Sequence, residues 1–300
     1  MPAWFVSGTG TARRTDRIRI KGLSLRPAWP LLRGGTFRDM RVTQALSLKT
    51  QLRTAAPLYG FFVGIPSPAV VEMVGCAGFD FAILDCEHGP TGIETLENMV
   101  RAAEAVGLAS IVRVPEASAA AIMAAVETGA DAIMVPHVAS AAAARRVVDH
   151  ACYPPLGRRG MNFMSRAARY GAGDRGTFIA GERDRLTVIA MVEDAEALPH
   201  VGAIARTEGI DVIFVGPNDL ATSLGHPGDV AHPDVVAAIA GIRRDVRVAG
   251  DLPLATTTSG GPLTAAPRIA ADGFAMVCFS AVGLLMASLR DLRASLAHPA

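Results

Sequence analysis

Short apolar runs alternate with longer stretches of helical pattern from about residue 42 to the end of the chain. Within the short runs, apolar residues follow one another with few polar residues between them. This pattern is typical of parallel strands that are covered on both faces. The strand candidates are residues 59–64, 81–85, 110–114, 132–135, 187–192, 212–215, 252–255 and 274–279.

Helical patterns separate most of these runs, for example at residues 95–105, 119–128, 141–150 and 233–248. A strand followed by a helix, repeated eight times over about 220 residues, fits a single α/β domain folded as a (β/α)8 TIM barrel. A doubly wound open sheet is the alternative, but no Gly-x-Gly-x-x-Gly follows the first strand to support dinucleotide binding. We therefore predict one barrel over residues 45–295.

Residues 1–44 have a different composition: many arginines stand among Gly, Pro and Ser, without a clear period. We expect this segment to be an extension outside the barrel. A targeting segment is one interpretation, but the apolar core of a secretion signal is missing. A flexible tail, or a start assigned too early with Met40 as the true start, fits the composition better.

Composition and charge exclude several functions. The net charge is +1 and the chain has only three Tyr and two Trp, so we expect no nucleic-acid partner. No apolar run reaches the ~20 residues of a membrane helix, so we expect no membrane partner. The four cysteines show no metal-binding spacing and indicate a reducing cytoplasm. The only lysines, Lys21 and Lys49, precede the first strand, which disfavours Schiff-base chemistry.

The segment FAILDCEH, residues 81–88, begins as a predicted buried strand. Three ionisable side chains stand at its end: Asp85, Glu87 and His88. In a barrel, the loops at the carboxyl ends of the strands build the active site. A catalytic function is therefore one interpretation of this segment. A solvated loop with one capping acid is the other.

Ionisable side chains also stand at the ends of three further strands: Arg113, Glu193 and Asp219. An arginine in the otherwise apolar IVRVP must be paired or directed at an anion. Carboxylates without Cys or paired His ligands form an oxygen site that suits Mg²⁺ or Mn²⁺, with Co²⁺ as a third candidate. Structural ion pairing among these residues is the alternative.

The segment 216–219, Gly-Pro-Asn-Asp, reads as a tight turn that opens a helix. Free backbone N–H groups and the helix dipole favour an anion at such a position, and a substrate carboxylate would fit there. For Asp219 alone, an N-cap is the alternative to a metal ligand.

Six motifs follow in order between about residues 46 and 292: AGFDFAILDCEHGP, IVRVP, GADAIMVPHV, YPPLGRRG, VED and VGPNDLATSLG. Together they resemble the HpcH/HpaI aldolase family, which comprises class II pyruvate aldolases such as 4-hydroxy-2-oxoheptanedioate aldolase and 2-dehydro-3-deoxyglucarate aldolase. The resemblance implies a TIM barrel of the phosphoenolpyruvate/pyruvate superfamily type. It also implies that the active protein is a homohexamer with a helix exchanged between partners.

The resemblance implies a role for each matching residue. Glu193 and Asp219 would bind the divalent metal, and His88, assisted by Asp85, would belong to the general base. Arg113 would stabilise the enolate that forms on the substrate.

The resemblance also implies that the backbone at Asn218 and Asp219 holds the substrate carboxylate. Two positions depart from the family pattern. Glu127 stands where relatives have an aspartate that tunes the catalytic histidine of a neighbouring subunit. Met191 stands where relatives often have a glutamine, and methionine cannot donate that hydrogen bond.

The sequence therefore predicts a metal-dependent aldolase that cleaves a 4-hydroxy-2-oxo acid to pyruvate and an aldehyde. One alternative is a CoA-ester lyase that resembles the citrate lyase β subunit; such lyases usually carry further C-terminal structure. The other is a non-catalytic barrel that binds a small oxo acid, which would keep Glu193 and Asp219 without needing His88.

Overall fold

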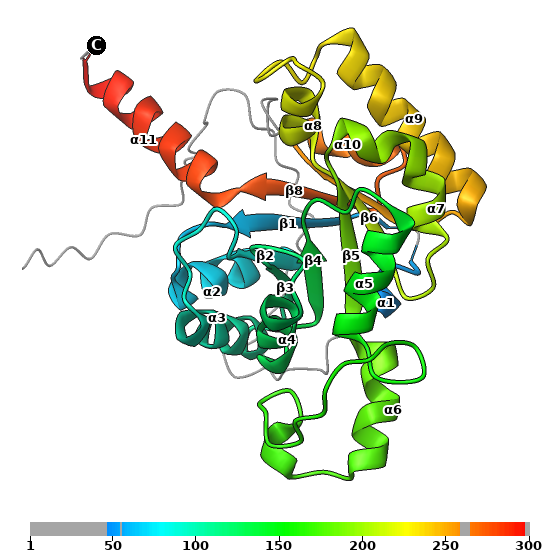
Figure 1. Ribbon diagram of the computed structural model, residues 1–300. Coiled ribbons are helices and arrows are strands. Elements are labelled where there is room, and N and C mark those ends of the chain that lie inside the picture. Colours follow the sequence, from blue (N-terminus) through cyan, green and yellow to red (C-terminus); the bar gives the residue numbers. More distant parts are fainter. Residues whose placement is uncertain (1–46, 55, 259–264, 298–300) are drawn as a thin grey trace, which may run out of the picture. The chain divides into compact units, whose positions relative to one another are not determined.

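The computed structural model describes residues 47–54, 56–258 and 265–297. The predicted extension, residues 1–44, lies outside them, so the predicted domain boundaries stay a prediction. Among the described residues, eight parallel strands close into a barrel in sequence order (Figure 1). They are β1 (Leu58–Val63), β2 (Phe81–Asp85), β3 (Ala109–Arg113), β4 (Ala132–Val135), β5 (Thr187–Val192), β6 (Val212–Val215), β7 (Leu254–Thr257) and β8 (Met276–Ser280). The predicted barrel is confirmed, and the alternative prediction, a doubly wound open sheet, is wrong.

A short helix, α1 (Leu48–Gln51), precedes β1, and the other helices follow the strands around the outside of the barrel, as the sequence pattern predicts (Figure 1). The outer helices are α2 (Pro68–Cys76), α3 (Ile93–Ala105), α4 (Ala119–Glu127), α5 (Ala141–Ala151), α6 (Arg175–Arg185), α7 (Val201–Ala205), α8 (Pro217–Ser223), α9 (Pro233–Ala249), α10 (Ala266–Ala271) and α11 (Ala281–Ala297).

Two strands begin two residues later than predicted. Pro253 has no N–H to donate, so ladder pairing of β7 starts at Leu254. The start of β8 follows from that of β7, because Met276 is in register with Ala255 on one side and with Leu58 on the other.

The core has two layers, and successive strand residues alternate between them. Ile83 belongs to a cluster made of strand side chains and Leu48, which fills the inside of the barrel. Leu84 belongs to a second cluster that also contains the buried faces of the surrounding helices. Both sides of each strand are therefore apolar, which explains why the runs show no polar alternation.

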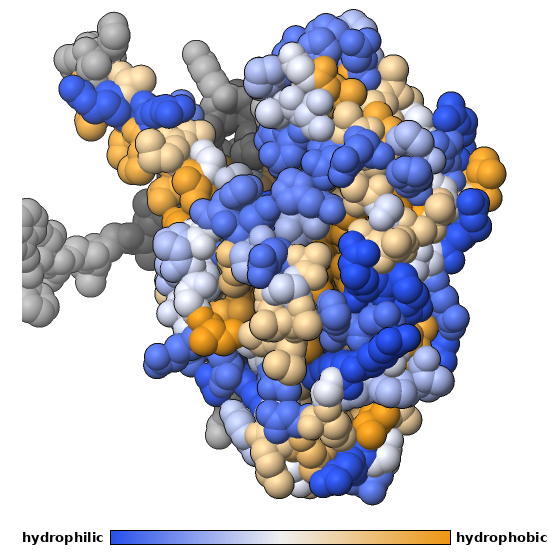
Figure 2. Space-filling view, viewed as in Figure 1, coloured by the Kyte–Doolittle hydropathy of each residue, from blue (hydrophilic) through white to orange (hydrophobic). Residues whose placement is uncertain are grey.

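The last helix, α11, leads away from the barrel (Figure 1). Its apolar residues remain exposed along its length and show as hydrophobic patches in Figure 2. They are Val282, Leu284, Leu285, Met286, Leu289, Leu292 and Leu296. Within the described part of the chain, no helix is both long and apolar enough to cross a membrane.

Candidate active site

A cavity of about 350 Å³ lies where the strands end, at the carboxyl side of the barrel. Five of the seven predicted site residues line it: Asp85, His88, Arg113, Asn218 and Asp219. The apolar part of the cavity wall is formed by Phe62, Phe214 and Met191. The barrel thus brings residues from β2, β3 and the start of α8 to one place, as the positions of these residues at strand ends predicted.

A buried ion pair joins the ends of β2 and β3. The register pairs Asp85 with Arg113 across the two strands. Arg113 donates from Nε to Oδ1 at 2.9 Å and from Nη2 to Oδ2 at 2.7 Å, a bidentate contact. Burial alone would raise the pKa of Asp85, but the hydrogen bonds and charge of Arg113 outweigh it and lower that pKa. Asp85 is therefore a carboxylate at neutral pH.

Asp85 also shapes the turn that carries His88. Its Oδ1 accepts from the backbone N–H of Glu87 at 3.1 Å and of His88 at 3.2 Å. Asp85 thus acts on the backbone of His88, and the described contacts include none between its carboxylate and the imidazole. The His88 side chain is 64 % exposed, with Nε2 3.9 Å from Oε2 of Glu87. The imidazole therefore has room to meet a substrate.

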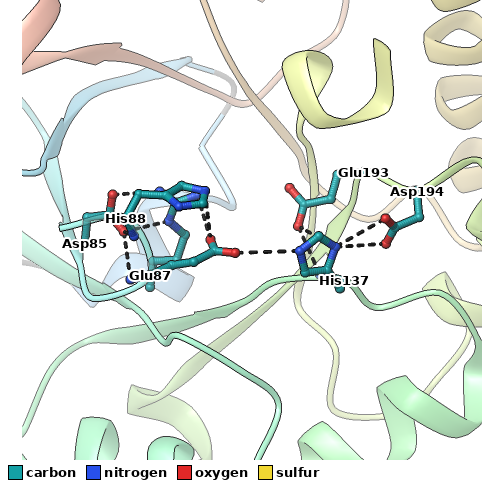
Figure 3. A network of polar contacts seen from close by, with 7 residues as sticks. Asp85, Glu87, His88, His137, Glu193 and Asp194 are labelled. Carbon is teal, nitrogen blue, oxygen red and sulfur yellow. Dashed lines mark hydrogen bonds and ion pairs between the residues drawn. The ribbon is translucent and has the colours of Figure 1, made fainter. Parts of the chain in front are cut away.

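Glu87 links this ion pair to a second group of charges (Figure 3). Its Oε2 lies 2.9 Å from Nη1 of Arg113, and its Oε1 lies 3.7 Å from Nε2 of His137. Arg113 therefore balances two carboxylates at once. The sequence indicated Glu87 only as part of a loop that ends in charges.

His137 is a residue that the sequence analysis missed. It stands two residues beyond β4 with φ at 55°, and its Nδ1 lies 3.1 and 3.2 Å from the oxygens of Asp194. Burial opposes its charge, but the hydrogen bond to Asp194 and the charge of Glu193 raise the pKa of His137. Its position just after a strand was the available signal, since His88 was found by the same criterion.

Glu193 lies deep at the end of β5 and is only 1 % exposed. Its Oε1 accepts from the backbone N–H of His137 at 3.0 Å. The carboxylate packs against Gly216, where an added Cβ would lie 2.6 Å from Oε2. Burial raises the pKa of Glu193 to about 7, and repulsion from Asp219 and Glu87 adds to the effect of burial.

The donor set at this rim fits a hard divalent cation. Glu193 and Asp219 repel each other, and Glu87 adds to the negative charge at Glu193. A cation bound by carboxylate oxygens relieves such repulsion. Glu193 and Asp219 are therefore residues that could hold a metal. The pKa of Glu193 is raised first by burial, and the negative charges of Asp219 and Glu87 add to that effect.

Glu127 does not join this site within the chain. It ends α4, which runs back to the amino ends of the strands, and its Oε2 accepts from Nδ2 of Asn162 at 3.2 Å. The site residues stand at the carboxyl ends of β2 and β3, on the other side of the barrel. The role that the resemblance implies for Glu127 therefore stays a prediction.

A separate group of metal-type ligands lies in the loop after α8 and the first turn of α9. It comprises His226, His232 and Asp234. His226 Nε2 lies 3.1 Å from Asp234 Oδ2, and the two imidazole rings stack with centroids 3.4 Å apart. His232 Nδ1 accepts from the backbone N–H of Asp234 at 3.2 Å. These contacts use one ring nitrogen of each histidine and one oxygen of Asp234.

Residues 58–279 match the family model described as HpcH/HpaI aldolase/citrate lyase. The chain belongs to this family. The resemblance that the sequence motifs predicted is therefore confirmed, as is the predicted enzyme class, a carbon–carbon lyase.

Curated members of the HpcH/HpaI family are similar over most of the chain. A hydroxypyruvate/pyruvate aldolase of Pseudomonas aeruginosa is 33 % identical over 250 residues, which cover 81 % of this chain and 90 % of the relative. A 5-keto-4-deoxy-D-glucarate aldolase of Salmonella paratyphi A is 37 % identical over 180 residues, covering 60 % and 70 % of the two chains.

A solved structure of an HpcH/HpaI aldolase/citrate lyase family protein from Burkholderia cenocepacia shares the fold with a TM-score of 0.78. It is 33 % identical, with 84 % of this chain and 99 % of that one covered. The citrate synthase SbnG, 30 % identical, reaches a TM-score of 0.74 with 84 % and 96 % covered.

The Asp85–Arg113 pair yields a prediction about stability. Asp85→Asn removes the charge that holds Arg113, while Glu87 remains as its partner, so we expect a loss of about 1–3 kcal/mol in the free energy of unfolding at pH 7. Because the pKa of folded Asp85 is lowered, its contribution is present at neutral pH and is lost as the pH falls below about 4. Urea denaturation at several pH values measures both effects.

Asp149→Asn is the matched control, because Asp149 pairs with Arg145 on a partly exposed helix face. We expect it to cost less than about 1 kcal/mol. Two outcomes would contradict the importance of the buried pair. One is an equal decrease in the free energy of unfolding in both variants. The other is a decrease in Asp85→Asn, relative to the unchanged chain, that stays as large at acidic pH as at pH 7.

Proposed function

We propose that the chain is a class II aldolase that reversibly cleaves a 4-hydroxy-2-oxo acid to pyruvate and an aldehyde. The observation that carries this proposal is the single cavity in which His88 and the fixed Arg113 face Asp219, with Glu193 behind it. The relatives named hydroxypyruvate/pyruvate aldolase and 5-keto-4-deoxy-D-glucarate aldolase support a 2-oxo acid as the substrate. A cytoplasmic location stays a prediction.

Glu193 and Asp219 would hold the divalent cation, with Mg²⁺ and Mn²⁺ as the first candidates and Co²⁺ as the third. Bound there, the cation supplies a Lewis acid for the keto oxygen, on which negative charge develops during cleavage. The backbone N–H groups of Asn218 and Asp219, in the first turn of α8, would hold the substrate carboxylate.

Arg113 has the right donors left for the developing enolate oxygen. A guanidinium has five N–H groups, and the hydrogen bonds to Asp85 use two of them, the one on Nε and one on Nη2. Nη1 forms an ion pair with Glu87, and the N–H groups left on Nη1 and Nη2 would stabilise the oxygen. The ion pairs fix the guanidinium plane before the substrate arrives, so no reorganisation is needed during the reaction.

His88 is the side chain proposed to take the proton from the C4 hydroxyl group. Its imidazole is exposed to the cavity while its backbone is held by Asp85. An aldehyde then leaves as the C3–C4 bond breaks, and pyruvate remains as the enolate. Met191, on the cavity wall, offers the substrate an apolar contact without a hydrogen-bond donor.

Pyruvate release from a panel of racemic 4-hydroxy-2-oxo acids tests the reaction and its metal. We expect release to be lost with EDTA and restored by Mg²⁺ or Mn²⁺, and to withstand borohydride treatment in the presence of substrate. Activity that survives EDTA but is abolished by borohydride would contradict the proposal. Binding of pyruvate without turnover of any compound would favour a binding protein, and turnover of thioesters alone would favour a CoA-ester lyase.

Two substitutions separate metal binding from catalysis. Glu193→Gln is expected to weaken metal binding at least about 100-fold by calorimetry, since it removes a charged ligand. Glu196→Gln is the control, because Glu196 is exposed in the next turn. Arg113→Ala is expected to lower kcat about 100- to 1000-fold while the metal still binds. Undiminished metal affinity in Glu193→Gln, or full turnover in Arg113→Ala, refutes the corresponding assignment.

We also infer that the chain assembles into a homohexamer. The number of subunits comes from the resemblance, and two observations support assembly. The apolar side chains of α11 are exposed, and the Glu127 of the same chain lies far from His88. A second copy of the chain would cover the apolar side chains of α11 and would bring its own Glu127 close to His88.

Mass photometry of the full chain and of Leu285→Glu/Leu289→Glu tests this assembly. We expect a hexamer for the unchanged chain, and smaller, less active species for the variant, because two charges would be buried at the interface. Ser288→Glu places a charge on an exposed residue of the same helix and serves as control. A monomeric, fully active chain would overturn the inference.

A further inference from the structure

The backbone of His137 lies in the left-handed region, with φ at 55°, just after the end of β4. Histidine enters this region more often than most residues, but only glycine does so without a steric penalty. Neighbouring contacts must therefore hold the backbone in this conformation. The reaction proposed above gives His137 no part.

The chain around His137 returns to the edge of β5 after a short break. β4 pairs in register with β5 up to Val135. Pro136 has no N–H to donate. The backbone N–H of Val138 then donates to the carbonyl oxygen of Met191 at 3.0 Å, and Val138 is only 1 % exposed. The residues before and after His137 are therefore both tied to β5.

The N–H of His137 itself points at a side chain. It donates to Oε1 of Glu193 at 3.0 Å, and Figure 3 shows His137 beside Glu193. Because Val138 is tied to Met191, a different φ at His137 would rotate the peptide plane that carries this N–H. The two hydrogen bonds, from His137 and from Val138, therefore require the left-handed conformation together.

The orientation of the Glu193 carboxylate depends on this N–H. Within the described part of the chain, Glu193 receives its one side-chain hydrogen bond from His137. On its other side the carboxylate meets the backbone at Gly216, where an added Cβ would lie 2.6 Å from Oε2. The carboxylate is thus held between the ends of β4 and β6.

The imidazole of His137 has other partners. Its Nδ1 lies 3.1 and 3.2 Å from the oxygens of Asp194, and its Nε2 lies 3.7 Å from Oε1 of Glu87. The side chain is 58 % exposed and is not among the residues that line the cavity. The backbone and the side chain of His137 therefore do different things and can be tested separately.

We propose that His137 is a positioning residue for the divalent cation and that it acts through its left-handed backbone, which orients the carboxylate of Glu193. This inference rests on the proposed function, in which Glu193 binds the cation. A ligand that is oriented before the cation arrives binds it more tightly, because less freedom is lost on binding. Position 137 therefore needs a residue that accepts a positive φ.

Calorimetry with Mn²⁺, without substrate, compares His137→Gly with His137→Val. Both variants lack the imidazole, so the loss of its charge and of its contact with Asp194 is common to both. Glycine keeps the positive φ without strain, whereas a β-branched residue is strongly disfavoured there. We expect His137→Val to bind Mn²⁺ about 10- to 100-fold more weakly than His137→Gly. If His137→Val fails to fold, His137→Ala takes its place and is expected to bind several-fold more weakly than His137→Gly.

Asp251 offers a matched control for the effect of backbone strain. Its φ is 58°, and it is exposed between α9 and β7, on the amino side of the barrel. The control variants are Asp251→Gly and Asp251→Val, which both lose the charge. We expect these two variants to bind Mn²⁺ equally well.

The outcomes separate this inference from the proposed function. Equal Mn²⁺ affinity in His137→Gly and His137→Val, while Glu193→Gln still weakens binding, overturns the inference and leaves the metal assignment intact. A difference of the same size between the two Asp251 variants also overturns it, because general strain would then be the cause. Unchanged Mn²⁺ affinity in Glu193→Gln overturns both the metal assignment and the inference.

Discussion

The ion pair between Asp85 and Arg113 is the contact on which the geometry of the candidate site depends. Both groups are buried at the ends of neighbouring strands, where neither charge is tolerated alone. The barrel register sets them opposite each other, so the pair forms as a consequence of the fold. The remaining acceptor capacity of Asp85 then fixes the backbone of His88. One carboxylate thus orients both the guanidinium and the turn that carries the imidazole.

The sequence predicted the barrel well because most strands are apolar on both faces and most breaks between strands carry a helical pattern. Two strands, β1 and β3, lie one residue earlier than predicted. The larger shifts are at the start of β7, where Pro253 delays pairing, and at the start of β8, which follows β7 in register. The segment around α6 was not predicted, since its polar composition hides a helix that begins at the Asp174 cap.

The candidate site was predictable to the extent that its residues stand at strand ends. His137 satisfies the same criterion but was missed, because its contacts with Glu193 and Asp194 join segments more than 50 positions apart. Local pattern does not reveal such contacts, which depend on β4 lying beside β5.

The close approach of Glu193 to Gly216 has a consequence for how this sequence can change over evolution. The carboxylate occupies the space where any other residue at 216 would place its Cβ. Position 216 is therefore closed to substitution for as long as position 193 carries a glutamate in this conformation. The two positions can therefore change only together, whereas a change at Met191 on the cavity wall alters the fit of a substrate and leaves the backbone intact.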